Sequence, residues 1–500
     1  MKHDQLRWLL ALCLFAAANA PATVRYVDLN SASPTPPFTN WVTAAVTIQD
    51  AVDAAVGGRR VVVTNGLYAT GGYPTNGPVH VRVGVGKPVS LRSVNGPQFT
   101  VIQGDTEPSP GSPGSIRCVT LGSSGASLSG FTLTNGNTWS GGGSGGRGGG
   151  VWCAGINTVV SNCVLVGNSA YEGGGAYGGT LINCTLTNNL AAYGGGANGS
   201  EQSQGAKLSI LINCTLTGNR SSFGGAGAHS CTLNSCTLTG NDEGARFCTL
   251  INCTLTGNWN GARSCTMNNC ALTGNYGVAA LNCTLNNCIV YYNFGADYDV
   301  NSTLNCCCTT FLPSAGFGNI TNAPLFVDQA GGNLRLQSNS PCINAGLNAY
   351  APGGPDLGGN PRIAGGTVDL GAYEFQSPAS VLSYAWAQQY GLPTDGSADY
   401  ADADSDHLNN WQEWIAGTVP TDPSSALRLL APASDASGVT VNWQSVTNRT
   451  YFLERSSHLG VQPSFLVLET NLAGLAGTTS YTDTNAVGPG PFFYRVGVQP

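Results

Sequence analysis

A short pattern of alternating apolar and polar residues recurs along the middle of the chain. Its fullest form is Asn-Cys-Thr-Leu-Thr-Gly-Asn, and its copies align on one column of cysteines: Cys163, Cys184, Cys214, Cys236, Cys253, Cys270 and Cys288. The spacings between these cysteines are 21, 30, 22, 17, 17 and 18 residues. A second column lies five residues before the first in the last four copies: Cys231, Cys248, Cys265 and Cys283.

Alternation within one copy predicts two short strands joined by a bend. Cys248 and Leu250 face inward on the first strand, Cys253 and Leu255 face inward on the second, and Ile251-Asn252 forms the bend. One such coil cannot bury its apolar face, but coils stacked about 4.8 Å apart turn Cys, Leu, Thr and Asn into continuous ladders. We therefore expect a parallel β-helix over about residues 118–310. The Gly-Asn pair after each second strand suits the next turn, because both residues tolerate positive φ.

Two further patterns fit the ends and turns of this solenoid. Residues 48–56 have helical apolar spacing and precede Val61-Val62-Val63, which predicts a helix that caps the open N-terminal end. Gly-rich tracts precede several strands, and no lysine follows them in a phosphate-loop pattern, so we interpret them as tight turns between coils. These tracts are 141–150, 173–175, 194–196 and 224–225.

Several segments resemble known families. The first part of the chain resembles the opening of right-handed β-helix proteins of the pectin-lyase-like class, and the glycine rhythm is similar to bacterial surface and autotransporter β-helices. The segments that carry the first resemblance are Tyr26-Val27-Asp28, 48–55, 64–68 and 89–97. Together these resemblances cover about residues 24–330, and they imply an all-β fold with a right-handed parallel β-helix.

The C-terminal part resembles two further modules. Residues 331–377 resemble the choice-of-anchor Q domain that ends many such β-helices, through the segments 340–346, 356–359, Arg362 and 366–374. Residues 426–500 show five strand-like segments with turn signals between them, and Trp443, Leu453 and Tyr494 are candidate core residues. This pattern is similar to a fibronectin type III domain. A small β-sandwich is therefore expected to follow the β-helix.

The expected organisation has five parts. Residues 1–20 are a signal peptide, with Lys2 and Arg7, an apolar run from Trp8 and small residues at Ala18-Asn19-Ala20. The other parts are a capped β-helix at 21–330, a segment closing it at 331–377, a helical linker at 378–425 and a sandwich at 426–500. We expect a secreted or outer-surface monomer, and no other stretch is long and apolar enough to cross a membrane.

The linker contains the sharpest chemical motif. Asp402, Asp404, Asp406, Asn410 and Glu413 supply side-chain oxygens at positions 1, 3, 5, 9 and 12, and Leu408 supplies a carbonyl at position 7, which is the spacing of a Ca²⁺ loop. His407 stands where such loops use glycine for its positive φ. The segment resembles single calcium loops of the dockerin or thrombospondin type 3 kind. The sequence thus predicts a structural Ca²⁺ site, with a plain acidic linker as the alternative.

Three other features have competing interpretations. The alternation of cysteine with leucine favours buried reduced ladders, with disulfides between coils or a metal site as alternatives, and Cys306-Cys307-Cys308 is the expected place for oxidation. The threonine columns suit exposed strand positions, and they also resemble ice-binding or glycan-contacting surfaces. Asp242, Glu243, Arg246 and Arg263 form a mixed-charge group on neighbouring coils. They are weak catalytic candidates, and an ion pair at a solvated edge is the simpler interpretation.

The charge of the chain and its lack of paired reactive side chains narrow the range of functions expected for it. The net charge is −7, and the 20 Lys and Arg residues are scattered, which argues against nucleic acid as a partner. We expect non-catalytic recognition of extracellular polysaccharide or another cell-surface component, because long ladders give extended surfaces. A polysaccharide lyase or glycoside hydrolase, and a structural spacer on the cell surface, are the alternatives.

Overall fold

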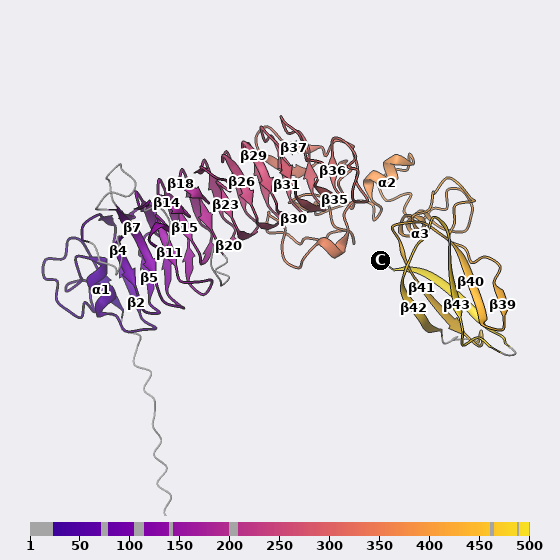
Figure 1. Ribbon diagram of the computed structural model, residues 1–500, viewed down its shortest axis with the longest axis horizontal. Coiled ribbons are helices and arrows are strands. Elements are labelled where there is room, and N and C mark those ends of the chain that lie inside the picture. The colour runs from indigo at the N-terminus through magenta and orange to yellow at the C-terminus, as the bar shows by residue number, and fades with distance from the viewer. Residues whose placement is uncertain are drawn as a thin grey trace, which may run out of the picture.

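The computed structural model shows a long solenoid followed by a separate small sandwich at the C-terminal end (Figure 1). It describes residues 24–71, 79–104, 115–139, 144–199, 209–460, 465–487 and 490–499. The signal peptide predicted at 1–20 lies outside these ranges. Within them, none of the helices has the length and apolar character needed to cross a membrane.

Two parallel sheets run along the whole solenoid. Sheet A consists of β1 (Arg25–Val27), β2 (Arg60–Val63), β5 (Ser90–Ser93), β8 (Ser127–Ser129), β12 (Val159–Ser161), β16 (Thr180–Ile182), β20 (Ser209–Ile212), β24 (Cys231–Asn234), β27 (Thr249–Ile251), β30 (Thr266–Asn268), β33 (Thr284–Asn286) and β35 (Thr303–Asn305). Sheet B consists of β3 (Gly66–Tyr68), β6 (Thr100–Gln103), β9 (Thr132–Thr134), β13 (Val164–Val166), β17 (Thr185–Thr187), β21 (Thr215–Thr217), β25 (Thr237–Thr239), β28 (Thr254–Thr256), β31 (Ala271–Thr273), β34 (Ile289–Val290) and β36 (Cys308–Thr309).

Two shorter parallel sheets close the other side of the coils. Sheet C consists of β4 (His80–Val85), β7 (Ile116–Leu121), β11 (Val151–Cys153), β15 (Ala176–Tyr177), β19 (Ala197–Asn198), β23 (Ala228–His229), β26 (Glu243–Arg246), β29 (Asn260–Arg263) and β32 (Ala280–Leu281). Sheet D consists of β10 (Asn137–Thr138), β14 (Ser169–Glu172), β18 (Leu190–Tyr193) and β22 (Arg220–Ser221). The predicted parallel β-helix is confirmed.

The inward residues are those that the alternation predicts. Cys248, Leu250, Cys253 and Leu255 are all buried, and the leucines stack in register from coil to coil. The bend lies at Asn252, which has a φ of 52°. Asparagine is favoured there because it tolerates the left-handed region.

A buried asparagine ladder joins the coils after sheet B. Asn241 donates to Asn258 Oδ1 from its backbone nitrogen at 3.0 Å and from Nδ2 at 2.9 Å. Asn258 bonds to Asn275 in the same way and also donates to Leu238 O at 3.0 Å. This corrects the interpretation of the Gly-Asn pair. Only the glycine takes the positive φ, as at Gly240, and the asparagine turns inward to satisfy backbone groups.

The Gly-rich tracts lie where neighbouring coils approach closely. A Cβ on Gly174 would lie 2.5 Å from Leu190 O, and a Cβ on Gly175 would lie 2.6 Å from Gly196 O. Glycine is therefore required by space at these two positions, whereas the positive φ of 68° at the neighbouring Gly173 fits the predicted tight turn. Part of the tract at 141–150 lies outside the described residues.

The cysteine columns lie inside the coils. Cys253 Sγ donates to Ile251 O at 3.1 Å and accepts from the backbone nitrogen of Cys236 at 3.4 Å. Outside these columns, on sheet C, burial raises the pKa of the Cys118 and Cys153 thiols to about 12, so these two thiols are neutral. The positions match the predicted ladder, and its reduced state stays a prediction.

Both ends of the solenoid are covered. The predicted cap is the helix α1 (Ile48–Ala54), whose N-terminus is capped by Thr47 and which buries Ile48, Ala51 and Val52 in the core. At the other end, Cys306 donates to Phe317 O at 2.7 Å and Ile320 donates to Cys307 O at 2.8 Å.

The segment after the last coil packs against the outer face of sheet B. Thr254 is an outward residue of sheet B. On the next two coils, the same position holds Ala271 and then Ile289. These two apolar residues lie in one buried cluster with Leu336, Ile343 and Leu370. The hairpin β37 (Phe326–Asp328) and β38 (Asn333–Leu336) and the helix α2 (Tyr384–Gln389) belong to the same region. The change from threonine to apolar residues thus marks where this segment covers the coils.

The C-terminal module is a small antiparallel β-sandwich. One sheet contains β39 (Ala433–Asp435), β40 (Gly438–Ser445) and β43 (Gly477–Asp483), and the other contains β42 (Leu466–Ala473), β41 (Thr450–Ser456) and β44 (Phe493–Gln499). Trp443 and Leu453 are fully buried, and Tyr494 packs against them partly exposed. All five predicted strands are present, and β39 is an additional edge strand that the sequence did not predict.

We expect Asn258→Ala to destabilise the solenoid strongly. The substitution leaves Leu238 O and two donors of Asn241 buried without partners, and each unpaired group costs about 1–3 kcal/mol. The free energy of unfolding in urea, followed by circular dichroism, should fall by at least about 3 kcal/mol. Thr249→Ala, at an exposed position of β27, is the control and should change it by less than about 0.5 kcal/mol. Equal unfolding midpoints for Asn258→Ala and the wild type would show that the ladder does not stabilise the coils.

Candidate functional site

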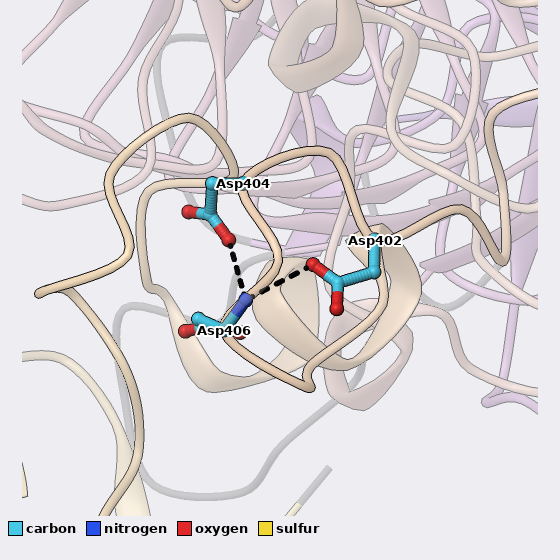
Figure 2. A group of neighbouring side chains, drawn as sticks. All are labelled: Asp402, Asp404 and Asp406. Atoms are coloured by element: carbon cyan, nitrogen blue, oxygen red, sulfur yellow. Dashed lines mark hydrogen bonds between the residues drawn. The ribbon is translucent and has the colours of Figure 1, made fainter.

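Three carboxylates converge in the linker between the solenoid and the sandwich. One oxygen from each of Asp402, Asp404 and Asp406 lies within 4.8 Å of the others (Figure 2). The backbone nitrogen of Asp406 donates to Asp402 Oδ1 and Asp404 Oδ1, each at 3.2 Å. The first three ligands of the predicted Ca²⁺ loop are therefore brought together.

The backbone of this loop has the shape that the motif needs. His407, which replaces the usual glycine, has a φ of 81°, and its nitrogen donates to Asp402 Oδ2 at 3.0 Å. A non-glycine residue pays roughly 1–2 kcal/mol for this conformation. Leu408, whose carbonyl is the predicted ligand at position 7, donates its own nitrogen to Asp406 Oδ1 at 2.7 Å. The backbone is thus strained at His407, and this conformation lets the loop fold around the carboxylates.

The helix α3 (Asn410–Ala416) begins directly after the loop and contributes the last two predicted ligands. A capping box starts it: Asn409 accepts from the Gln412 nitrogen at 2.9 Å, and Gln412 Oε1 accepts from the Asn409 nitrogen at 2.9 Å. Asn410 and Glu413 lie one turn apart on α3, and both are buried. Burial, and then the nearby Asp404 and Asp406 carboxylates, raise the pKa of Glu413 to about 7.

Several oxygens of this group are buried without a hydrogen-bond donor. They are Asp404 Oδ2, Asp406 Oδ2, Asn410 Oδ1 and Glu413 Oε2. The cationic group nearest to Asp406 is Arg428 Nη2, at 3.8 Å from Oδ2, while the Asp406 side chain itself is fully buried. Buried carboxylate oxygens normally have partners, and hard oxygen donors at this spacing are what Ca²⁺ binds. The residues present therefore fit the predicted ion.

The mixed-charge group on the coils separates into two ion pairs. Arg263 Nε lies 3.2 Å from Glu243 Oε1, and Asp242 Oδ2 lies 3.7 Å from Arg220 Nε, which belongs to the preceding coil. Arg246 donates instead to Phe223 O. Glu243 thus lies buried beside the guanidinium groups of Arg246 and Arg263, whereas Asp242 pairs separately with Arg220.

Glu243 is the least exposed member of this group. Its Oε2 accepts from the Gly225 nitrogen at 2.5 Å, and burial raises its pKa. The adjacent His229 lies in register with Arg246, and burial lowers the pKa of its imidazole. The carboxylate oxygens of Glu243 are therefore bound by a backbone amide and a guanidinium. This is the arrangement expected for an ion pair at the edge of the coils.

Three aromatic side chains form an exposed row beside these ion pairs, which we call the aromatic row: Trp259, Tyr276 and Phe294. Each follows an asparagine of the ladder, so stacking brings them to neighbouring coils. The ring centroids of Trp259 and Tyr276 lie 6.5 Å apart and those of Tyr276 and Phe294 lie 5.1 Å apart, at interplanar angles of 22° and 12°. These residues keep 66%, 55% and 75% of their surface exposed.

The aromatic row was not predicted from the sequence, although the sequence contains a pattern that indicates it. An aromatic residue follows the terminal asparagine of the repeat at Asn258-Trp259, Asn275-Tyr276 and Asn293-Phe294. Asp242 occupies the position of Trp259 on the preceding coil, so the aromatic row begins on the coil next to the Asp242 ion pair. On earlier coils, further rings make contacts between neighbours: Trp139, Tyr171, Tyr193, Phe223, His229 and Phe247.

Comparisons with known proteins add the following. Neither a protein-family model nor a curated protein sequence matches the chain. Among solved structures, the chain is similar to a rhamnogalacturonan lyase at 12% identity, with 63% of this chain and 95% of that chain covered and a TM-score of 0.38. It is also similar to the A-module of the Azotobacter vinelandii mannuronan C-5 epimerase AlgE4 at 15% identity, with 54% and 92% covered and a TM-score of 0.30.

A third similar structure is a pectin methylesterase in complex with a hexasaccharide. It shares 11% identity, with 60% of this chain and 93% of that chain covered and a TM-score of 0.28. Likenesses with TM-scores this low carry no argument about function. The fold rests instead on the parallel strand pairing described above.

We expect the full-length protein to bind one Ca²⁺ at the linker. Glu413→Gln removes a charge but keeps the shape of the side chain, so it should weaken binding at least about tenfold in calorimetric titration. Asp395→Asn, an equal charge change at an exposed aspartate outside the loop, is the control and should bind as the wild type does. A wild-type titration without calcium heat would favour the plain acidic linker.

Proposed function

We propose that this protein is exported and recognises an extracellular polysaccharide through the aromatic row and the adjoining ion pairs, without cleaving it. The observation that carries the proposal is the exposure of Trp259, Tyr276 and Phe294 in one line on consecutive coils. Exposed aromatic clusters on a soluble protein mark interaction sites, because each ring left in water forgoes the free energy of burial.

The chemistry around the row favours a sugar polymer over other partners. Sugar rings present C–H faces that pack against aromatic rings and hydroxyl groups that need polar partners. Asp242 and Arg220 supply such partners on the preceding coils, and Arg263, which pairs with the buried Glu243, supplies a partly exposed guanidinium beside Trp259. A row that repeats with every coil also suits a ligand that repeats along its length.

The arrangement of charge favours binding over catalysis. Glu243 and Arg263 neutralise each other, and Glu243 also accepts from Gly225. A general acid or base must reach the proton it transfers, whereas these carboxylate oxygens are already engaged. The lyase or hydrolase remains the second candidate, supported by the raised pKa of the buried Glu243 beside two guanidinium groups.

We expect Tyr276→Ala to weaken polysaccharide binding. Wild-type protein should be retarded in affinity electrophoresis by at least one of polygalacturonate, alginate, xylan and a β-glucan. Truncation of an aromatic anchor in a binding surface costs about 1 kcal/mol or more, so the dissociation constant should rise at least about fivefold. Phe99→Ala, which removes an exposed ring on an early coil, is the matched control and should bind normally. Unchanged retardation of Tyr276→Ala would remove the row from the binding site.

The same polysaccharides provide a test of the enzymatic alternative. We expect no unsaturated products in ultraviolet absorbance and no new reducing ends after incubation with the wild-type protein, because the candidate acid is held in an ion pair. Product formation that disappears in Glu243→Gln would replace the recognition function with catalysis.

A further inference from the structure

The carboxylate loop lies at the joint between the β-helix and the sandwich, and the residues just before it are tied to the β-helix side. Asp399 accepts from Ser380 Oγ at 2.6 Å and from the Val381 nitrogen at 3.0 Å. Asn344, in the segment that covers the last coils, donates to Ser380 O at 2.8 Å. A continuous set of contacts therefore connects the solenoid to the start of the loop.

The two ends of the loop are pinned to each other. Asn410 donates its nitrogen to Ala401 O at 2.8 Å and its Nδ2 to Ala398 O at 2.8 Å, and Trp411 donates to Asp399 O at 3.0 Å. The first turn of α3 is thus held against the residues just before Asp402. The loop that carries the carboxylates and the first turn of α3 therefore form one short hydrogen-bonded unit.

The sandwich is attached to the far side of α3. Arg449, between β40 and β41, donates to Ile415 O at 2.8 Å and to Trp414 O at 3.1 Å, which are carbonyls of the last turn. Trp411 and Ile415 line an apolar pocket together with Leu427, Val496 and Val498 of the sandwich side. The orientation of the sandwich therefore follows that of α3.

Arg428 adds a direct link from the loop to the sandwich. Its guanidinium lies 3.8 Å from the buried Asp406 Oδ2, while its carbonyl accepts from Gln444 of β40 at 2.9 Å. One guanidinium at this distance does not balance Asp402, Asp404, Asp406 and Glu413. Their mutual repulsion strains the loop, and a divalent cation coordinated by their oxygens relieves it.

We propose that Ca²⁺ bound by Asp402, Asp404, Asp406 and Glu413 fixes the sandwich relative to the β-helix, and that loss of Ca²⁺ loosens this joint. The coupling is reciprocal: contacts that hold α3 in place also raise the affinity of the loop for the ion. This inference goes beyond polysaccharide recognition and does not depend on it, because the aromatic row lies on the coils.

The test is limited proteolysis of the full-length protein by chymotrypsin, with Ca²⁺ or with EGTA, together with small-angle X-ray scattering. Tyr400 and Trp414 flank the loop and Trp411 lies within it, and all three are cleavage sites at the joint. With Ca²⁺ we expect slow cleavage and a single extended shape. With EGTA, cleavage at these residues should accelerate at least tenfold, and the scattering should show a broader distribution of dimensions.

Two variants, with Asp395→Asn as their control, separate the steps of the proposal. Glu413→Gln should behave as the EGTA sample even with Ca²⁺ present, whereas Asp395→Asn should behave as the wild type. Arg449→Met keeps every proposed ligand but loses the bonds to α3, so it should bind Ca²⁺ in calorimetry and still be cleaved rapidly. Ca²⁺ binding with identical cleavage and scattering in EGTA would overturn the proposal, as would the absence of Ca²⁺ binding. Polysaccharide retardation, measured on the same samples, reports separately on the aromatic row.

Discussion

The buried asparagine ladder is the interaction on which the rest of the structure depends. It joins Asn189 to Asn219, 30 residues apart, through bonds of 3.1 and 3.0 Å, and Asn241 to Asn258, 17 residues apart, through bonds of 3.0 and 2.9 Å. The bonds are the same although the coils differ in length. Because each asparagine satisfies two donors of its neighbour, register is restored after every coil whatever is inserted elsewhere.

Because the register is constant, residues at the same position of successive coils form rows on the surface. From Asn219 onward, the position after the ladder asparagine holds Arg220, Asp242, Trp259, Tyr276 and Phe294 on successive coils. A charged pair thus forms between two coils and an aromatic row between the next three, with no loop needed to position either. The proposed recognition surface is therefore a direct product of stacking.

Much of this fold could be predicted from the repeat because period-two alternation and stacking are local rules. Cys248, Leu250, Cys253 and Leu255 face inward as expected. The role of the ladder asparagine could not be read in the same way, because asparagine suits both a positive-φ turn and a buried hydrogen-bonding position. Only the neighbouring coil decides between them. The edge strand β39 escaped prediction because it is short, and its residues are exposed.

The candidate sites were likewise predicted only in part from the sequence. Ligand spacing predicted that Asp402, Asp404 and Asp406 would converge, because the loop is short and local. It did not predict that α3 is bonded to the sandwich, since Arg449 and Ile415 lie 34 residues apart in the chain. The group at Asp242, Glu243, Arg246 and Arg263 looked like one cluster in sequence. In three dimensions it pairs across coils, with Arg220 as a partner that the sequence did not suggest.

The central claim is that coil stacking builds a sugar-binding row at Trp259, Tyr276 and Phe294. Hydroxyl-radical footprinting of the full-length protein with and without the retarding polysaccharide measures this most directly, because aromatic side chains are readily oxidised where they are exposed. The account predicts that oxidation of these three residues falls when the polysaccharide is present, while oxidation of Phe99 and of Leu466 on the sandwich is unchanged. Protection of the threonine columns or the sandwich, with the three aromatic residues oxidised as before, would contradict it.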